Sequence, residues 1–585
     1  MGMARRKFVN GAAASLTGRP ARAQTQLRRR PNILLILSDD QGYGDLSLHG
    51  NPILQTPALD RLARESTELT RFHVSPVCAP TRASLLTGRY HLRTGVHGVT
   101  AGRETLPTSE STIARALRES GYHTALYGKW HLGSHYPHVP QAMGFDDFIG
   151  FRTGHWIDYW DPLLERNGRP YPLKGYITEA LTNEALRFLD ERRDPFFLYL
   201  AYNVPHSPFQ VPERFWDRVR QAPLPPETRA AYALTACLDE NIGRVLAKLR
   251  DLKIEDDTIV IFLSDNGPNG ARFNSGLRGA KGSVYEGGTR VPCFLRWPGH
   301  IAAGRQVDQI AAHIDLYPTL LELSRAPQPD DAPPIDGRTL VPLLTLPNPR
   351  WADRPLYVHA EPPADPSALY PGAVRTQRFN LVNGSELYDV DADPGEQENV
   401  AAKYPDWAEY LRMAYQAWFR SALPRGGFRR PAIPVGYAEE NPSFLPPPEG
   451  YPHGVLRYRN TDGFAHDWFV NWASPGDFAH WDLDVVRAGR FEISLRYLCP
   501  AESVGAKIEV RAGAGSAAAV IRDVTPMEPI PARDVVPRRE TYRMHWSTLT
   551  LGALELAKGP AQLELHAFAR SAGLETNEVI LRRVA

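Results

Sequence analysis

Continuous apolar runs, separated by stretches of helical periodicity, dominate the first part of the chain. Residues 33–38, ILLILS, and 258–264, TIVIFLS, are typical of strands buried on both faces of a parallel sheet, and 195–201, PFFLYLA, is a third such run. Between them, STIARALRES at 111–120 predicts a helix with Ser111 as N-cap and Gly121 just past its end. This alternation predicts an α/β fold with polar groups collected beyond the carboxyl ends of the strands.

The pattern changes after about residue 345. We predict an α/β domain over 31–345, and over 346–425 a smaller α+β subdomain that includes the helical stretch YPDWAEYLRMAYQAWFRSAL. Residues 426–450 are rich in proline and predict a linker. Within 451–585, segments such as GRFEISLRYLC and AKIEVRAG alternate apolar and polar positions, which predicts an added antiparallel β-sandwich.

Composition argues against several classes of partner and structure. The 585 residues carry 67 basic and 66 acidic side chains, a net charge of +1, which argues against a nucleic-acid-binding surface. The four cysteines are widely spaced and fit neither a zinc motif nor a dense disulfide framework. No apolar run reaches the roughly 20 residues of a membrane span, so no membrane-spanning helix is expected.

Residues 1–30 form a basic leader. Arg5 and Arg6 precede a short stretch of small residues and an Ala-Arg-Ala sequence at 21–23, a pattern that resembles a twin-arginine export signal with a cleavage site. The alternative is a plain basic leader, because Asn10 and Gly18 interrupt the apolar stretch. The export interpretation predicts a periplasmic or extracellular protein.

Oxygen-bearing side chains follow two of the predicted strands. Asp39 and Asp40 end one apolar run, and Asp265 and Asn266 end another. Either pair alone is equally typical of a turn or a helix cap. Two matched pairs at strand ends favour a cation among them, and hard oxygen ligands prefer calcium or magnesium to zinc.

A second set of residues is suited to an anion. Cys78 begins a predicted helix that ends at Gly88, and a lone cysteine is otherwise most often a small buried residue. Lysines are usually solvated and histidines often satisfied in a core, but a cationic set beside a divalent metal would suit an anionic substrate. Lys129 and His131 are two residues apart in GKWHLG, so in an extended segment both side chains lie on one side. The whole set consists of Arg82, Lys129, His131, His206 and Lys281.

These residues carry a family resemblance. CAPTRASLLTGR at 78–89 resembles the sulfatase signature C-x-P-[ST]-R, and GYHTALYGKWHLG at 121–133 resembles the second signature of that family. Further motifs, among them ILSDDQGYGD, FLSDNG, EGGTRVP and DGRTLVPLL, follow in the expected order over roughly residues 31–400. The resemblance implies an alkaline phosphatase-like sandwich with a large, mostly parallel central sheet.

The resemblance also implies a mechanism for a sulfuric ester hydrolase acting on an aryl or carbohydrate sulfate. A separate formylglycine-generating maturation enzyme would oxidise Cys78 to formylglycine (3-oxoalanine), whose hydrated aldehyde supplies the nucleophile. Cys78, once modified, would join Asp39, Asp40, Asp265 and Asn266 around one Ca²⁺ per subunit. Arg82, Lys129 and Lys281 would hold the sulfate, His206 would protonate the leaving oxygen, and His131 would accept the proton of the second hydroxyl.

Two other function classes stay open at this point. A phosphate or phosphonate ester hydrolase of the same superfamily would use the same residues, and a non-catalytic glycan-binding protein would result if Cys78 is not converted. The β-sandwich contains an aromatic cluster, which we expect either in its core or, on an exposed face, stacked against the rings of a sulfated glycan. Its members are Trp468, Phe469, Trp472, Phe478 and Trp481.

Overall fold

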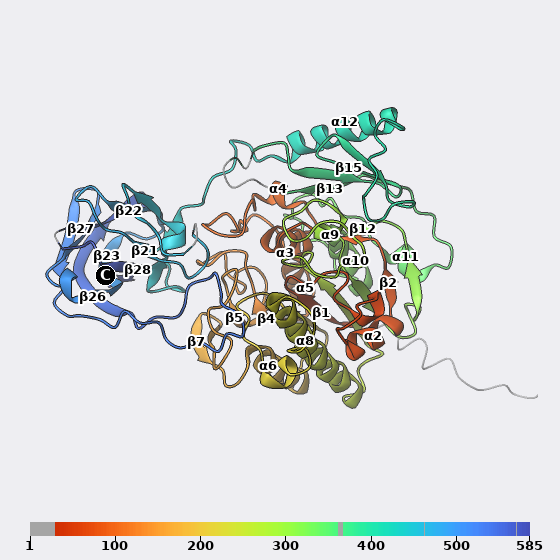
Figure 1. Ribbon diagram of the computed structural model, residues 1–585, viewed down its shortest axis with the longest axis horizontal. Helices are drawn as coiled ribbons and strands as arrows, with labels where there is room; N and C mark the ends of the chain where they lie inside the picture. Colours follow the sequence, from red (N-terminus) through yellow and green to blue (C-terminus); the bar gives the residue numbers. More distant parts are fainter. Residues whose placement is uncertain (1–29, 361–364, 366, 461–462, 569, 585) are drawn as a thin grey trace, which may run out of the picture.

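The structure, a computed structural model, describes residues 30–360, 365, 367–460, 463–568 and 570–584. Figure 1 shows an α/β domain in the middle, a small subdomain beside it and a separate β-rich domain. The predicted export signal lies in residues 1–29, outside the described residues. Among the described helices, none has both the length and the apolar character needed to cross a membrane.

A ten-stranded sheet forms the centre of the α/β domain, in the order β11-β2-β10-β9-β1-β8-β4-β5-β6-β7. Its central strands β9, β1, β8, β4 and β5 are parallel, whereas β10 and β6 pair antiparallel with both of their neighbours. The predicted large, mostly parallel sheet is therefore confirmed. The strands are β1 (Asn32–Ser38), β2 (Thr67–Leu69), β4 (His123–Lys129), β5 (Asp147–Phe151), β6 (Leu163–Arg166), β7 (Arg169–Pro172), β8 (Phe196–Ala201), β9 (Thr258–Ser264), β10 (Cys293–Arg296) and β11 (Arg305–Val307).

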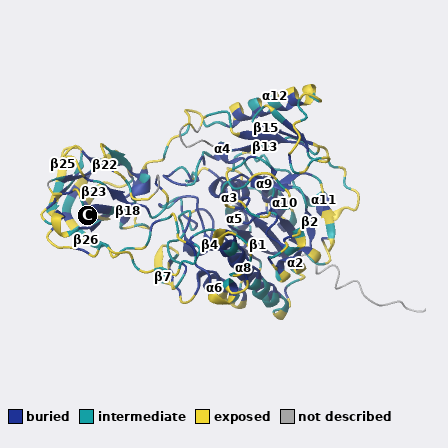
Figure 2. Ribbon diagram, viewed as in Figure 1, coloured by how far each residue is buried: buried dark blue, intermediate teal, exposed yellow. Residues whose placement is uncertain are grey.

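Helices cover both faces of this sheet. Successive side chains of a strand point to opposite faces, so Leu34 and Ile36 pack with one set of helices while Ile33 and Leu35 pack with the other. All four are buried, and Figure 2 shows the central strands buried throughout. The first set is α2 (Pro57–Arg64), α6 (Ile177–Glu191) and α8 (Pro226–Asp251); the second is α3 (Cys78–Thr87), α5 (Ile113–Glu119) and α10 (Leu316–Ser324).

The remaining elements of the domain are short. The start of α5 differs from the prediction by one residue: Thr112, not Ser111, is the N-cap, because its Oγ1 accepts a hydrogen bond from the backbone N–H of Arg115 at 3.1 Å. The short elements are α4 (His91–Thr94), α7 (Glu213–Trp216), α9 (Glu286–Thr289), α11 (Val341–Thr345), and the paired strands β3 (Phe72–His73) and β12 (Ala311–Ala312).

The small subdomain is an antiparallel sheet covered by one long helix. Trp418 and Phe419 of that helix are buried in a core shared with Val374 and Leu381 of the sheet. The predicted α+β character of this region agrees with these elements. They are β13 (Leu356–His359), β14 (Gly372–Arg375), β15 (Phe379–Val382), β16 (Glu386–Asp389) and α12 (Pro405–Ala422).

The last part of the chain is a sandwich of two sheets that share one core. One sheet has the order β17-β22-β27-β24-β25 with β19 beside β22, and the other has the order β20-β21-β28-β23-β26 with β18 beside β28. Its strands are β17 (Ile433–Val435), β18 (Ser443–Leu445), β19 (Tyr451–His453), β20 (Arg457–Tyr458), β21 (Phe469–Val470), β22 (Phe478–Val485), β23 (Gly489–Leu498), β24 (Lys507–Ala512), β25 (Gly515–Val520), β26 (Ser547–Leu556), β27 (Gly559–Phe568) and β28 (Glu575–Arg583).

Two features of the sandwich correct the sequence interpretation. Strands β17 and β18 lie within 426–450, predicted as a linker, and pair with β22 and β28, so the sandwich begins before residue 451. β17 pairs in parallel, which makes the sandwich not wholly antiparallel. The many prolines of this region indicated a linker, but proline is also tolerated in short strands at the edge of a sheet. Of the aromatic cluster, Trp468, Phe469, Trp472 and Trp481 are buried, so they form no exposed platform.

Candidate functional site

The two pairs of oxygen-bearing residues meet at one edge of the sheet. β1 and β9 are parallel neighbours with Ser38 opposite Ser264, so the residues that follow, Asp39 and Asp265, leave the sheet side by side. The backbone N–H of Asp40 donates to Asp265 Oδ1 at 3.1 Å, and Asn266 Nδ2 donates to Asp40 Oδ1 at 2.8 Å. The structure thus brings together the four oxygen-bearing residues among the five predicted metal ligands.

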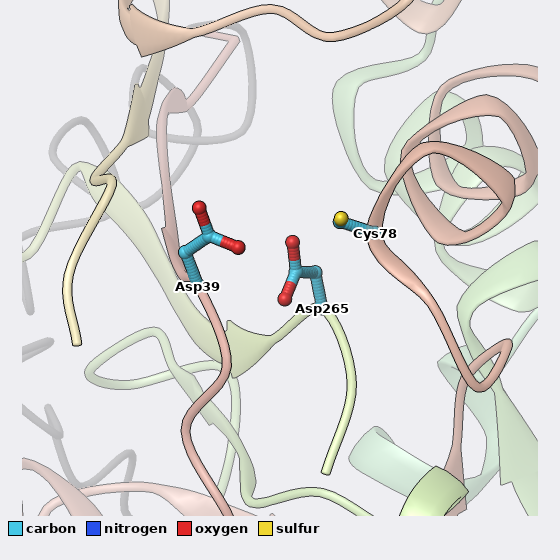
Figure 3. A group of neighbouring side chains, drawn as sticks. All are labelled: Asp39, Cys78 and Asp265. Atoms are coloured by element: carbon cyan, nitrogen blue, oxygen red, sulfur yellow. The ribbon is translucent and has the colours of Figure 1, made fainter. Parts of the chain in front are cut away.

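Cys78 lies next to these carboxylates, at the first residue of α3. The helix starts there because Val77 is extended, and it ends at Gly88, whose φ of 69° is favourable for glycine. Cys78 Sγ and one carboxylate oxygen each of Asp39 and Asp265 lie within 4.8 Å of one another, and Figure 3 shows the three side chains converging. Burial raises the pKa of the Cys78 thiol.

Three cations neutralise the carboxylates. Lys129, the last residue of β4, places Nζ 2.8 Å from Asp39 Oδ2, and Lys281 Nζ is 2.6 Å from Asp40 Oδ1. Arg82 Nη2 donates to Asp265 Oδ2 at 2.8 Å, and its Nη1 donates to the Lys129 carbonyl at 2.9 Å. The side chains of Arg82 and Lys129 are 0% exposed, whereas that of Lys281 is 18% exposed. Solvent therefore reaches the cluster at Lys281.

The carboxylates differ electrostatically. Burial acts to raise the pKa of Asp40, but the charges of Lys281 and His206 outweigh it and hold that pKa well below its usual range. For Asp265, burial and the neighbouring Asp39 raise the pKa to about 6 against the opposing effect of Arg82. Asp40 also has a left-handed backbone, with φ of 68°.

The two predicted histidines lie at the same site, and in each ring one nitrogen contacts a backbone carbonyl while the other does not. His131 Nε2 contacts the Val99 carbonyl at 2.7 Å, and His206 Nδ1 contacts the Ser207 carbonyl at 2.7 Å. A carbonyl only accepts, so these nitrogens donate and leave His131 Nδ1 and His206 Nε2 as acceptors. His206 Nε2 lies 3.7 Å from Asp40 Oδ2. Burial and then the charge of Lys129 lower the pKa of His131. Burial also lowers the pKa of His206, to about 4.

His131 reaches the site in a way that the sequence did not indicate. Alternation along an extended segment predicted Lys129 and His131 on one side, but β4 ends at Lys129 and His131 has a positive φ of 61°. The left-handed backbone, not strand alternation, turns this histidine toward the cluster.

Further residues of the site were missed by sequence reasoning. Arg272 pairs with Asp45 at 2.7 Å and donates to the Asp40 carbonyl at 2.7 Å, which supports the strained Asp40 backbone. His155 is buried, and its ring is nearly parallel to that of His206 with centroids 6.2 Å apart. His155 lies in GHWIDYW, a segment rich in aromatics, which was the only signal that the sequence offered.

Comparison with known proteins identifies the family of this chain. Residues 31–326 match the family model described as Sulfatase, and residues 280–414 match the model of the N-sulphoglucosamine sulphohydrolase C-terminal region. The human N-acetylgalactosamine-6-sulfatase is 33% identical over 366 residues, which cover 56% of this chain and 68% of that protein. Human arylsulfatase A is 34% identical over 409 residues, which cover 63% and 78% of the two chains.

A solved structure shares the fold. The crystal structure of Ps i-CgsB superposes with a TM-score of 0.62 at 29% identity, covering 69% of this chain and 94% of that one. The match of the family model to half of the chain, the long alignments with curated sulfatases and the converging strand-end carboxylates lead to one assignment. The chain belongs to the sulfatase family, with the alkaline phosphatase-like fold, and is a sulfatase.

Proposed function

We propose that this sulfatase hydrolyses a sulfate ester with an oxidised Cys78 as nucleophile, beside a calcium ion held by Asp39, Asp40, Asp265 and Asn266. The observation that carries the proposal is the convergence of Cys78 with the carboxylates that follow two neighbouring strands.

The donor set fits a hard divalent cation. Asp39 Oδ1, Asp40 Oδ2 and Asn266 Oδ1 are buried and have no hydrogen-bond partner among the described residues. Buried oxygens of this kind are normally satisfied, and carboxylate and amide oxygens are the ligands that calcium prefers. Calcium bound there would supply positive charge that stabilises anionic oxygens of the nucleophile and the ester.

Cys78 is better suited as a precursor than as a reactive thiol. A soft thiolate is a poor neighbour for a hard cation among oxygen ligands, whereas an oxygen nucleophile suits it. Oxidation of Cys78 to formylglycine by a maturation enzyme would supply the hydroxyl groups of a hydrated aldehyde. Cys78 is 3% exposed, so this enzyme would act before the region folds.

The other side chains divide between holding the site and handling substrate. Arg82 and Lys129 are fully buried against Asp265 and Asp39, which favours a role in holding these carboxylates and stabilising negative charge at short range. Lys281, which is partly exposed, is placed to attract the sulfate oxygens of an entering ester.

Protons would move through the two histidines. His206, 12% exposed, turns Nε2 toward the site because its Nδ1 donates to Ser207, so this nitrogen is placed to deliver a proton to the leaving oxygen. His131 Nδ1 is buried without a hydrogen-bond partner among the described residues, and as an acceptor it is placed to take a proton. The carbonyl that each ring contacts determines which nitrogen is left for substrate, Nε2 of His206 and Nδ1 of His131; to act as the acid, His206 Nε2 would first have to take up a proton.

A carbohydrate sulfate is the favoured substrate class. A structure of Ps i-CgsB in complex with k-i-k-neocarrahexaose, at 29% identity, shows that a related protein binds a carbohydrate. The proposed partners are a sulfated glycan and the maturation enzyme, and the proposed location is periplasmic or extracellular.

The test is the release of sulfate and phosphate from matched aryl esters. The chain is co-produced with a formylglycine-generating enzyme and loaded with calcium, and Cys78→Ala is the control. We expect sulfate release that disappears in the control. Dominant phosphate or phosphonate release would support the alternative hydrolase. No turnover of either aryl ester despite confirmed conversion would point to a site restricted to glycan sulfates, whereas Cys78 that stays unconverted would favour a non-catalytic glycan-binding protein.

A further inference from the structure

The β-sandwich is fixed to the α/β domain by a long segment, residues 521–546, which lies between β25 and β26 and contains no helix or strand. In Figure 1 this blue segment runs from the sandwich to the α/β domain near β5 and β7. Val535 N–H donates to the Phe209 carbonyl at 2.9 Å, and Arg538 Nη1 donates to the Ile157 carbonyl at 2.6 Å. Val536 is 4% exposed and packs into the core of the α/β domain. Long irregular segments that pack in this way are usually functional.

The end of this segment reaches the residue after His206. Glu540 accepts a hydrogen bond from the Ser207 hydroxyl. The Ser207 carbonyl in turn accepts from His206 Nδ1 at 2.7 Å and from the Tyr159 hydroxyl at 2.9 Å. A side chain of the sandwich therefore holds the turn that orients the proposed proton donor.

A second part of the sandwich approaches the same place. The Thr541 hydroxyl donates to the His466 carbonyl at 2.8 Å, and His466 Nε2 donates to the His155 carbonyl at 3.1 Å. The ring of His466 is 5.3 Å from the rings of both His155 and Trp156. His466 has a φ of 67°, a costly backbone conformation for a residue with a side chain, which these contacts maintain.

His155 completes the arrangement from the α/β domain. Its residue is 6% exposed, and Nε2 has no hydrogen-bond partner among the described residues. Its ring lies next to that of His206, with centroids 6.2 Å apart and planes 7° apart. A buried, unpartnered ring nitrogen beside the proton donor is a polar group to which a ligand would bond.

Solvent reaches the site on the side of His206 and Lys281. The side chains of His206 and Lys281 are 12% and 18% exposed, whereas Asp39 and Lys129 are 0% exposed. With the sulfate held at Lys281, the group that departs with the leaving oxygen lies against His206 and its neighbours. Those neighbours offer imidazole nitrogens, a carboxylate and the indole of Trp156, a combination that matches the hydroxyls and apolar faces of a sugar better than a plain aryl ring.

We propose that the β-sandwich forms the leaving-group side of the active site: His466, together with His155, hydrogen bonds a carbohydrate leaving group, and Glu540 positions His206 through Ser207. The inference rests on the proposed sulfatase function and deepens it. The sandwich then determines specificity at the catalytic centre, in addition to any binding of polymer elsewhere. His466 is a specificity-determining residue, and Glu540 is a positioning residue.

The experiment uses the full chain, converted at Cys78 and loaded with calcium. The probes are 4-nitrophenyl sulfate, N-acetylgalactosamine 6-sulfate, D-glucosamine 2-N,6-O-disulfate and a sulfated carrageenan hexasaccharide. The variants are His466→Ala and Glu540→Ala. His480→Ala on β22 is the matched control, because His480 packs against His453 within the sandwich.

For the carbohydrate sulfate that the wild type cleaves, we expect His466→Ala to raise KM about tenfold, the effect of losing one good hydrogen bond. Glu540→Ala, which removes the oxygen that accepts from Ser207, should lower kcat about tenfold with little change in KM, because a displaced His206 protonates a poor leaving group less effectively. Both variants should stay within about threefold of wild type on 4-nitrophenyl sulfate, whose leaving group needs no proton. His480→Ala should change neither kcat nor KM on either class of substrate.

Three outcomes would overturn the inference. Equal losses on aryl and carbohydrate sulfates would indicate a structural role, and unchanged carbohydrate turnover in both variants would exclude the contact. Wild-type enzyme that cleaves 4-nitrophenyl sulfate but none of the carbohydrate sulfates would refute the subsite while leaving the proposed function intact. Wild-type enzyme that cleaves none of the probes would instead overturn the proposed function on which the inference rests.

Discussion

Glu104 is a buried carboxyl group at the contact between the α/β domain and the β-sandwich. Its residue is 8% exposed, and Oε2 has no hydrogen-bond partner among the described residues. Burial and then the charge of Glu449 raise its pKa from 4.5 to about 7, against the weaker effects of Arg103 and His135. Glu449 belongs to the sandwich and pairs with His135 of the α/β domain at 2.9 Å. The perturbation is Glu104→Gln, which keeps the shape of the neutral acid.

The sign of the pH dependence follows from the direction of this pKa. A carboxyl group with a higher pKa in the folded than in the unfolded protein stabilises the fold below the unfolded pKa, and this stability is lost as pH rises through the folded pKa. For Glu104 the window runs from 4.5 to about 7. At about 1.4 kcal/mol per pKa unit the whole effect is about 3 kcal/mol, of which about 2.5 kcal/mol falls between roughly pH 5 and pH 8.

The assay is thermal and urea unfolding of wild type and Glu104→Gln at several pH values across this range, followed by tryptophan fluorescence. Relative to the variant, the wild type should lose about 2.5 kcal/mol of unfolding free energy toward the alkaline end. Burial lowers the pKa of His135, but the charge and the hydrogen bond of Glu449, together with Glu440, outweigh it and raise that pKa. His135 therefore contributes in the same direction, and because it is present in both proteins most of its contribution cancels in the difference.

Glu398→Gln, at an exposed carboxylate, is the matched control and should follow the wild type at every pH. Parallel curves for wild type and Glu104→Gln would refute the reasoning, because they would mean that Glu104 ionises equally in the folded and unfolded chains. A wild type that gains stability relative to the variant as pH rises would refute its sign.

Three further predictions concern the site and the sandwich. Because Cys78 is 3% exposed, mass spectrometry should find it converted when the maturation enzyme is co-produced and unconverted when that enzyme is added to folded protein; equal conversion would contradict its burial. Removal of divalent cations with EDTA should lower the thermal midpoint and abolish sulfate release, with both restored by calcium, since the carboxylates of Asp39, Asp40 and Asp265 repel one another; an unchanged midpoint would argue against a resident cation. Trp481→Ala should destabilise the sandwich by about 3–5 kcal/mol in urea unfolding, because this 0% exposed side chain fills its core, and near-normal stability would contradict that packing.

Much of the α/β domain follows from local pattern. Apolar runs at 33–38 and 258–264 become the adjacent parallel strands β1 and β9, because a strand buried on both faces consists mainly of apolar side chains. The pattern was weaker where proline or irregular backbone intervened. It missed β17 and β18 in the proline-rich segment. It also predicted that strand alternation directs His131 to the site, whereas the left-handed backbone of His131 does so.

The motifs and the apolar runs were sufficient to predict the family, the parallel core and the identity of the converging strand-end residues, because these depend on short segments whose spacing is directly readable. Which surfaces meet depends on the fold of the whole chain: Ser207 donates to Glu540, and the ring of His155 lies beside those of His206 and His466. The physical reason is that contacts between domains depend on how two separately folded surfaces fit together. No local periodicity encodes that fit, so the sequence around His466 gives no indication that its ring packs against His155 of the α/β domain.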